Sequence, residues 1–126
     1  MLRRILAGVL GAAAALNGLV MLADGARWYQ VVPGVTHTGP FNPHFIADIG
    51  AAFLAAGGAL IARAWRPALW PAAVAGAAFI GLHGIIHIVD LATGRSHQPA
   101  VDFGLIVFPA ALTLWAAFPD KGESNA

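Results

Sequence analysis

The sequence contains no cysteine. Thiol–disulfide chemistry, iron–sulfur ligation and thiolate zinc sites are therefore excluded. Charge is also scarce: Asp, Glu, Lys and Arg make up only 10% of the residues, against roughly 25% in a soluble domain. Because 59% of the residues are hydrophobic, we expect lipid to be the main solvent of this chain. The net charge of +1 and the lack of any Lys/Arg cluster beyond pairs argue against a nucleic-acid partner.

Four apolar stretches approach the roughly 20 residues that a helix needs to cross a bilayer. We expect helices at about 5–23, 44–62, 67–91 and 100–118, with loops at 24–43 and 92–99 on one side of the membrane. These segments leave no spare length for a soluble domain. The sequence therefore predicts an all-α bundle of four transmembrane helices, forming one integral membrane domain over 1–126.

The first apolar stretch has some features of a secretory signal peptide, because Arg3 and Arg4 precede it. However, the stretch is long, and the residues around Ala23 and Asp24 form a poor cleavage site. We therefore expect the segment to be retained as the first membrane helix.

The distribution of basic residues predicts the orientation of the bundle. Four spans place both termini and the loop between the second and third helices on one side. That side carries Arg3, Arg4, Arg63, Arg66 and Lys121, and the other side carries Arg27 and Arg95. Since basic residues near span ends remain cytoplasmic, both termini are expected on the cytoplasmic side, and the loops at 24–43 and 92–99 on the periplasmic or exterior side.

Three local signals predict where helices begin, end or bend. Asn42 followed by Pro43 is typical of a helix N-cap with proline at the first helical position. Gly94 is well placed to end the third helix. Pro109 lies within the fourth helix, where it should produce a kink and free the carbonyl of Leu105.

Histidines and aspartates interrupt the apolar stretches at the same predicted end of the bundle. His83, His87 and Asp90 have i, i+4, i+7 spacing and share one helical face, and His44 and Asp48 have i, i+4 spacing on the preceding helix. Ionisable groups inside a membrane are unfavourable, so they usually face the bundle interior or water at a functional site. Because the two helices are antiparallel neighbours, we expect the two rows to overlap in depth.

The residue types favour a metal site. Two or three histidines with one or two aspartates suit Zn, Fe, Mn or Cu(II) and lack the sulfur ligands that select Cu(I). The predicted metal ligands are His44, Asp48, His83, His87 and Asp90, and Asp102 and Asn17 are further candidate ligand-binding residues. Haem is less favoured, since two histidines of one helix at i, i+4 cannot bind opposite haem faces.

Known histidine motifs limit the chemistry further. The Glu-x-x-His motif of ferritin-like di-iron proteins is missing. Gly84 stands where a zincin helix carries its catalytic glutamate. Hydrolysis by that mechanism is excluded, and the sequence leaves open whether the protein is an enzyme.

Two further expectations concern the surroundings of these residues. Small residues should let the second helix approach its neighbours closely. The face of that helix that carries small residues should therefore point inward: Ala51, Ala52, Ala55, Ala59 and Ala62. The large hydrophobic residues on its other side should meet lipid: Phe45, Ile49, Phe53 and Leu60. Asp90 lies at a helix C-terminus, where the helix dipole disfavours an anion. A metal ion, an imidazolium or Arg95 should therefore offset its charge.

A second function remains open beside the metal site. The alternative hypothesis is an accessory or structural subunit of a larger membrane complex, in which the polar residues serve as interhelical hydrogen-bond partners. Under this interpretation Asn17 joins helices, Asp102 is solvated, and His37 and His97 are surface loop residues. Proton or ion passage is a third hypothesis, which the inner half of the bundle supports poorly because Thr113 is its main polar residue.

The segment from Phe41 to Phe45, Phe-Asn-Pro-His-Phe, is followed by Asp48-Ile49-Gly50 and later by His83 and His87. This pattern resembles small four-helix proteins of bacterial inner membranes, which are DoxX-like in scale and topology. The resemblance implies a fold and an inner-membrane location, and it carries no catalytic residue over to this chain.

Overall fold

The computed structural model describes residues 1–120 and 123. Within these residues every regular element is helical and no strand occurs, which confirms the all-α prediction. The elements are α1 (Leu2–Ala23), α2 (Gly25–Val31), η1 (Val35–His37), α3 (Pro43–Trp65), η2 (Pro67–Leu69), α4 (Trp70–Ala92), α5 (Pro99–Val101), the π-helical segment η3 (Asp102–Val107) and α6 (Phe108–Ala117).

Four helical segments are long and apolar enough to cross a membrane: Leu2–Ala23, Pro43–Trp65, Pro67–Ala92 and Pro99–Ala117. They agree with the predicted spans to within a few residues. Large hydrophobic side chains remain exposed along all four, such as Val9, Phe45, Ile86 and Leu105. Length and composition thus make the chain a multi-pass helical membrane protein.

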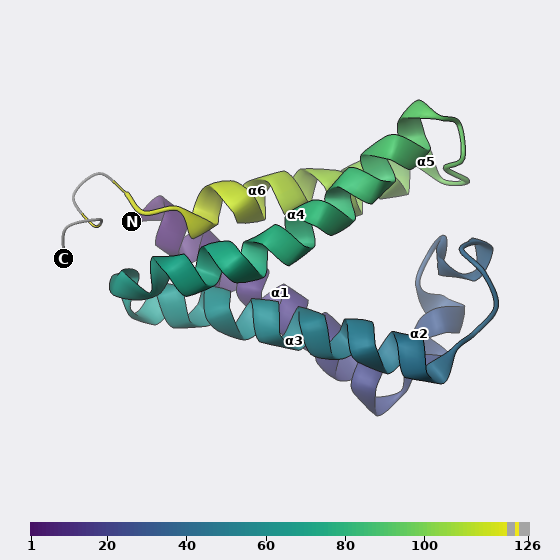
Figure 1. Cartoon of the computed structure of the whole chain (residues 1–126), viewed down its shortest axis with the longest axis horizontal. Helices are drawn as coiled ribbons and strands as arrows, with labels where there is room; N and C mark the ends of the chain where they lie inside the picture. The colour runs from purple at the N-terminus through teal and green to yellow at the C-terminus, as the bar shows by residue number, and fades with distance from the viewer. Residues whose placement is uncertain (121–122, 124–126) are drawn as a thin grey trace.

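The helices form two antiparallel pairs, α1 with α3 and α4 with α6 (Figure 1). We call the end that holds residues 1–4, 63–70 and 117–120 the terminal end. The opposite end, with residues 24–42 and 93–98, is the loop end. The ribbons of α3 and α4 lie side by side near the terminal end and diverge toward the loop end (Figure 1).

Glycine sets the close approach of α1 to α3. Gly11 and Gly18 are seven positions apart on α1, and Gly50 and Gly57 have the same spacing on α3. A Cβ atom on Gly57 would lie 2.5 Å from both the Ala15 amide nitrogen and the Gly11 carbonyl oxygen. No side chain fits between the two backbones there, so the bare glycine surfaces allow the contact.

This packing corrects the expected inward face of α3. Leu60 is fully buried and Phe53 packs against Phe79 of α4, whereas Ala51 and Ala55 are exposed. The expectation failed at these positions because glycine, rather than alanine, forms the closest contact with α1, whereas Phe45 is exposed, as expected. The side of α3 that faces the bundle therefore lies between its glycine residues, which contact α1, and Phe53, which contacts α4.

The predicted helix ends at the loop end are confirmed. The Asn42 side chain accepts a hydrogen bond from the Phe45 amide at 3.1 Å, with Pro43 at the start of α3. Gly94 has φ +71°, and the Arg95 amide donates to the Asp90 carbonyl at 2.9 Å, which together form a Schellman-type end to α4.

The long predicted loop also contains an unexpected helix, α2. Its first turn is capped by Asp24, whose side chain accepts a hydrogen bond from the Arg27 amide at 3.1 Å. The aspartate cap was visible in the sequence, but seven residues of helix are too short to give a periodic signal. The segment 24–43 is thus partly helical.

The expected disturbance at Pro109 takes the form of a π-helical segment. In η3 the Phe108 amide donates to the Phe103 carbonyl, five residues earlier. The wider turn accommodates a proline that has no N–H and whose ring would meet the carbonyl of Leu105. Such π-helical turns occur frequently at functional sites, and this one begins with Asp102.

The α4–α6 pair is buried mainly toward the terminal end, whereas α1 and α3 have buried residues along their whole length. The core at the terminal end includes Ala7, Leu60, Ala73 and Ala116, all with no exposed surface. In contrast, α4 has no buried residue after Gly84, and α5 and η3 have none. The loop end of the α4–α6 pair is therefore the less tightly packed part, and it holds His83, His87, His97, Asp90 and Asp102.

Candidate functional site

His87 and Asp102 form a contact between α4 and η3 at the loop end. The Nδ1 atom of His87 lies 3.2 Å from Oδ1 of Asp102, and these side chains are only 18% and 14% exposed. The Ser96 hydroxyl donates to Oδ2 of the same carboxylate at 2.5 Å. We call His83, His87, Ser96 and Asp102 the histidine–carboxylate cluster.

His87 and Asp102 lie close enough for an ion pair, but the ring nitrogen of His87 is not aligned with the carboxylate for a hydrogen bond. Nδ1 of His87 is buried and has no hydrogen-bond partner among the residues that the structure describes. Leaving a buried polar atom unpaired costs about 1–3 kcal/mol. A hydrogen-bond or metal partner at His87 would therefore stabilise the cluster.

His83 completes the cluster on the side nearest α3. Its ring lies 4.8 Å from the His87 ring, centroid to centroid, at an interplanar angle of 71°. The Phe53 ring of α3 contacts His83 edge to face, with centroids 5.8 Å apart. The i, i+4 spacing thus places the two imidazoles side by side, as predicted, with an aromatic neighbour that was expected to face lipid.

The other predicted metal ligands lie elsewhere. His44 and Asp48 pair with each other at 3.5 Å on α3, where their side chains are 89% and 63% exposed. Asp90 pairs with Arg95 at 2.9 Å, which is one of the partners that its position at a helix C-terminus predicted. In the described part of the chain, no three His, Asp or Glu side chains gather closely enough to hold one metal ion.

Asn17 and the loop histidines make separate contacts. The Asn17 side-chain oxygen accepts a hydrogen bond from Trp28 Nε1 at 2.9 Å, so Asn17 joins α1 to α2. The exposed rings of His37 and His97 stack with their centroids 4.9 Å apart and an interplanar angle of 9°. This stack connects the two loops of the loop end. The sequence did not predict this contact, because His37 and His97 are far apart along the chain.

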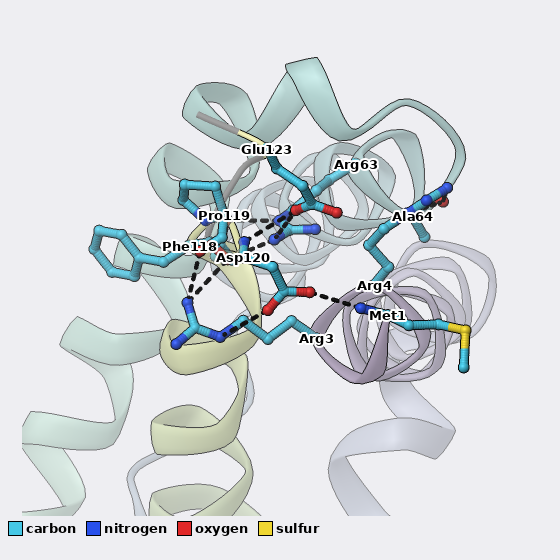
Figure 2. A network of polar contacts seen from close by, with 10 residues as sticks. Met1, Arg3, Arg4, Arg63, Ala64, Phe118, Pro119, Asp120 and Glu123 are labelled. Carbon is cyan, nitrogen blue, oxygen red and sulfur yellow. Dashed lines mark hydrogen bonds and ion pairs between the residues drawn. The ribbon is translucent and has the colours of Figure 1, made fainter. Parts of the chain in front are cut away.

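A second polar group lies at the terminal end, centred on Arg63 (Figure 2). Arg63 is fully buried. Its Nε donates to the Ala117 carbonyl at 2.8 Å, and its Nη2 donates to the Phe118 carbonyl at 2.5 Å. Nη2 also lies 3.4 Å from a carboxylate oxygen of Glu123. Arg63 therefore satisfies carbonyls that the end of α6 leaves free.

Neighbouring basic groups extend this network. Arg3 donates to the Pro119 carbonyl at 2.9 Å, and Arg4 donates to the Ala64 carbonyl at 3.0 Å (Figure 2). The N-terminal ammonium group of Met1 donates to the Asp120 carboxylate at 2.7 Å. This hydrogen bond holds the pKa of Asp120 below its ordinary value. Lys121, also expected at this end, lies outside the described residues.

Two polar contacts in these groups, those of Ser96 and Arg63, were not predicted from the sequence. Ser96 is a loop residue whose hydroxyl reaches Asp102 only because the chain turns back into η3. Arg63 was counted as a cytoplasmic charge, although it is enclosed by the ends of α3 and α6. Arg63 directly follows the predicted helix at 44–62, so the sequence contained no signal of its burial. In the structure α3 continues to Trp65 and includes Arg63, and an arginine inside a span needs a partner.

No protein-family model, no curated protein and no solved structure matches the chain.

Proposed function

We propose that this protein is a small multi-pass protein of the bacterial inner membrane whose histidine–carboxylate cluster binds a divalent transition metal ion. The observation that supports this most is the arrangement around His87: a second imidazole at 4.8 Å and a carboxylate at 3.2 Å from its Nδ1. A carboxylate that accepts the hydrogen of one ring nitrogen orients the imidazole so that the other nitrogen faces a metal, and the 3.2 Å separation brings Asp102 within reach of that role.

The donor set defines the class of ion. His83 and His87 offer two imidazole nitrogens on one helical face, and imidazole suits Zn, Cu, Fe and Ni, with Mn favoured by added carboxylate. Asp102 then supports His87 from beside its Nδ1 atom rather than serving as a third ligand. With two imidazoles, the remaining coordination positions fall to water or a small polar ligand, as at metal sites that keep an open position.

The proposed orientation follows from the charges at the two ends. Arg3, Arg4 and Arg66 lie at the terminal end, and basic residues near span ends stay in the cytoplasm. The cluster then lies toward the periplasmic side, at the loop end. A reporter fusion at either terminus, active only in the cytoplasm, tests this assignment.

Metal analysis of the detergent-purified protein tests the metal site. We expect about one Zn, Fe, Cu or Mn per chain, or one Zn²⁺ bound in a calorimetric titration of the metal-free protein. His83→Ala and His87→Ala should abolish binding. The matched control is His44→Ala, which removes an exposed histidine that also has an i, i+4 partner, on α3. Equal binding by the His83→Ala variant and the wild type would contradict the proposal.

A second candidate is an accessory subunit in which the cluster holds helices together. It is favoured by the same contacts, since His87, Asp102 and Ser96 join α4, the loop after it and η3. This alternative predicts a metal-free protein that copurifies with a membrane partner. It also predicts that Asp102→Asn lowers stability and that His83→Ala, which removes the ring contacts with Phe53 and His87, lowers it as well.

A further inference from the structure

A groove of about 400 Å³ lies on the outer surface of the bundle at the terminal end. It runs along α3 to the start of the α4 span and is lined by Gly58, Ile61, Ala62, Trp65, Arg66 and Leu69. Gly58 leaves its floor open, because a Cβ atom there would have no neighbour within 4 Å. The groove is therefore apolar along its length, with one basic side chain at its end.

That basic side chain, Arg66, is exposed and makes no side-chain hydrogen bond or ion pair with the residues that the structure describes. The other arginines of this end have partners within the protein: Arg3 and Arg63 bind carbonyls of the C-terminal segment, and Arg4 binds the Ala64 carbonyl (Figure 2). Among the described residues, the guanidinium group of Arg66 is thus available to an anion from outside the chain.

The dimensions of the groove match a lipid at the membrane surface. Trp65 is 81% exposed beside Arg66, and tryptophan favours the level of the lipid headgroups. From Arg66 to Gly58 the helix rises by about 12 Å. The apolar floor therefore extends from the headgroup level well into the hydrocarbon region, over the length of several methylene groups of an acyl chain.

We propose that this groove binds an anionic phospholipid. The guanidinium group of Arg66 binds the phosphate, Trp65 lies at the glycerol level, and an acyl chain lies over Gly58. A choline headgroup carries its own positive charge close to the phosphate, so Arg66 favours an anionic lipid over phosphatidylcholine. Basic sites at the ends of membrane helices recognise anionic headgroups in this way. The inference rests on the membrane spans and is independent of the metal site.

Native mass spectrometry of the full chain, released from detergent with phosphatidylglycerol or phosphatidylcholine of equal chain length, tests this proposal. We expect one phosphatidylglycerol to remain bound in preference to phosphatidylcholine. Arg66→Gln should weaken phosphatidylglycerol binding about fivefold, the effect of one basic residue at an anionic surface. The matched control is Arg27→Gln, which removes an exposed arginine at the loop end and should bind as the wild type does.

A second variant tests the apolar part of the groove. Gly58→Leu fills the floor without meeting a neighbouring atom at its Cβ, so it should fold normally and lose binding of both lipids. Phosphatidylglycerol binding that is the same in Arg66→Gln, Arg27→Gln and the wild type would overturn the proposal. Dimers that disappear in Gly58→Leu, with lipid binding unchanged, would assign the groove to a second copy of the chain and overturn it as well.

Discussion

Replacing Gly57 by alanine should destabilise the bundle, whereas the same change at the next residue should not. A Cβ atom on Gly57 would lie 2.5 Å from the Ala15 nitrogen and the Gly11 oxygen and 2.9 Å from the Ala15 Cα. All three atoms belong to the backbone of α1, so no side chain can rotate away and the helices must separate. At Gly58 an added Cβ meets nothing within 4 Å.

The two changes have the same chemistry and similar helix propensity, so their difference isolates the packing effect. Overpacking of this kind costs about 1–3 kcal/mol, and replacing glycine by alanine in a helix returns up to about 1 kcal/mol. We therefore expect Gly57→Ala to be less stable than Gly58→Ala by about 1–3 kcal/mol. Unfolding by sodium dodecyl sulfate in mixed micelles, followed by circular dichroism, measures this difference. A Gly57→Ala variant as stable as Gly58→Ala would refute the packing of α1 on α3.

Three further predictions concern charged residues, and the same unfolding assay measures each. Arg63→Ala should lower stability by about 2–4 kcal/mol, because it removes charged hydrogen bonds to two carbonyls. The control Arg66→Ala should change stability by less than about 0.5 kcal/mol. Equal losses of stability in the two variants would contradict the buried role of Arg63. Because the folded pKa of Asp120 is lowered, its stabilisation is present above the ordinary aspartate pKa and is lost as the pH falls through the folded value. The stability difference between the wild type and Asp120→Asn should therefore shrink on acidification, and a growing difference would contradict the ion pair. Arg95→Gln breaks an exposed pair with Asp90 and should change stability by less than about 1 kcal/mol.

The helical architecture could be predicted because apolar length is the dominant signal in a membrane protein. The spans, the Asn42 cap and the Gly94 end depend on local residue types, and all three are confirmed. The inward face of α3 could not be predicted in the same way. Its packing depends on which small residue meets the backbone of α1, and periodicity does not distinguish Gly57 from the nearby alanines.

The candidate site was predicted only in part for a related reason. Spacing along α4 correctly placed His83 beside His87, because the i, i+4 relation is local. The partner from another element depends on how far α3 and α4 diverge, and sequence spacing does not contain that angle. The carboxylate beside His87 therefore comes from Asp102 of η3, while Asp48 of α3 remains exposed.

Nuclear magnetic resonance of the ¹⁵N-histidine-labelled protein in micelles tests the central claim most directly, namely that His83 and His87 bind one metal ion together. On addition of one equivalent of Zn²⁺, we predict that the ring nitrogens of both residues shift and that His37, His44 and His97 keep their metal-free positions. Shifts confined to these three exposed histidines, with His83 and His87 unchanged, would contradict the account.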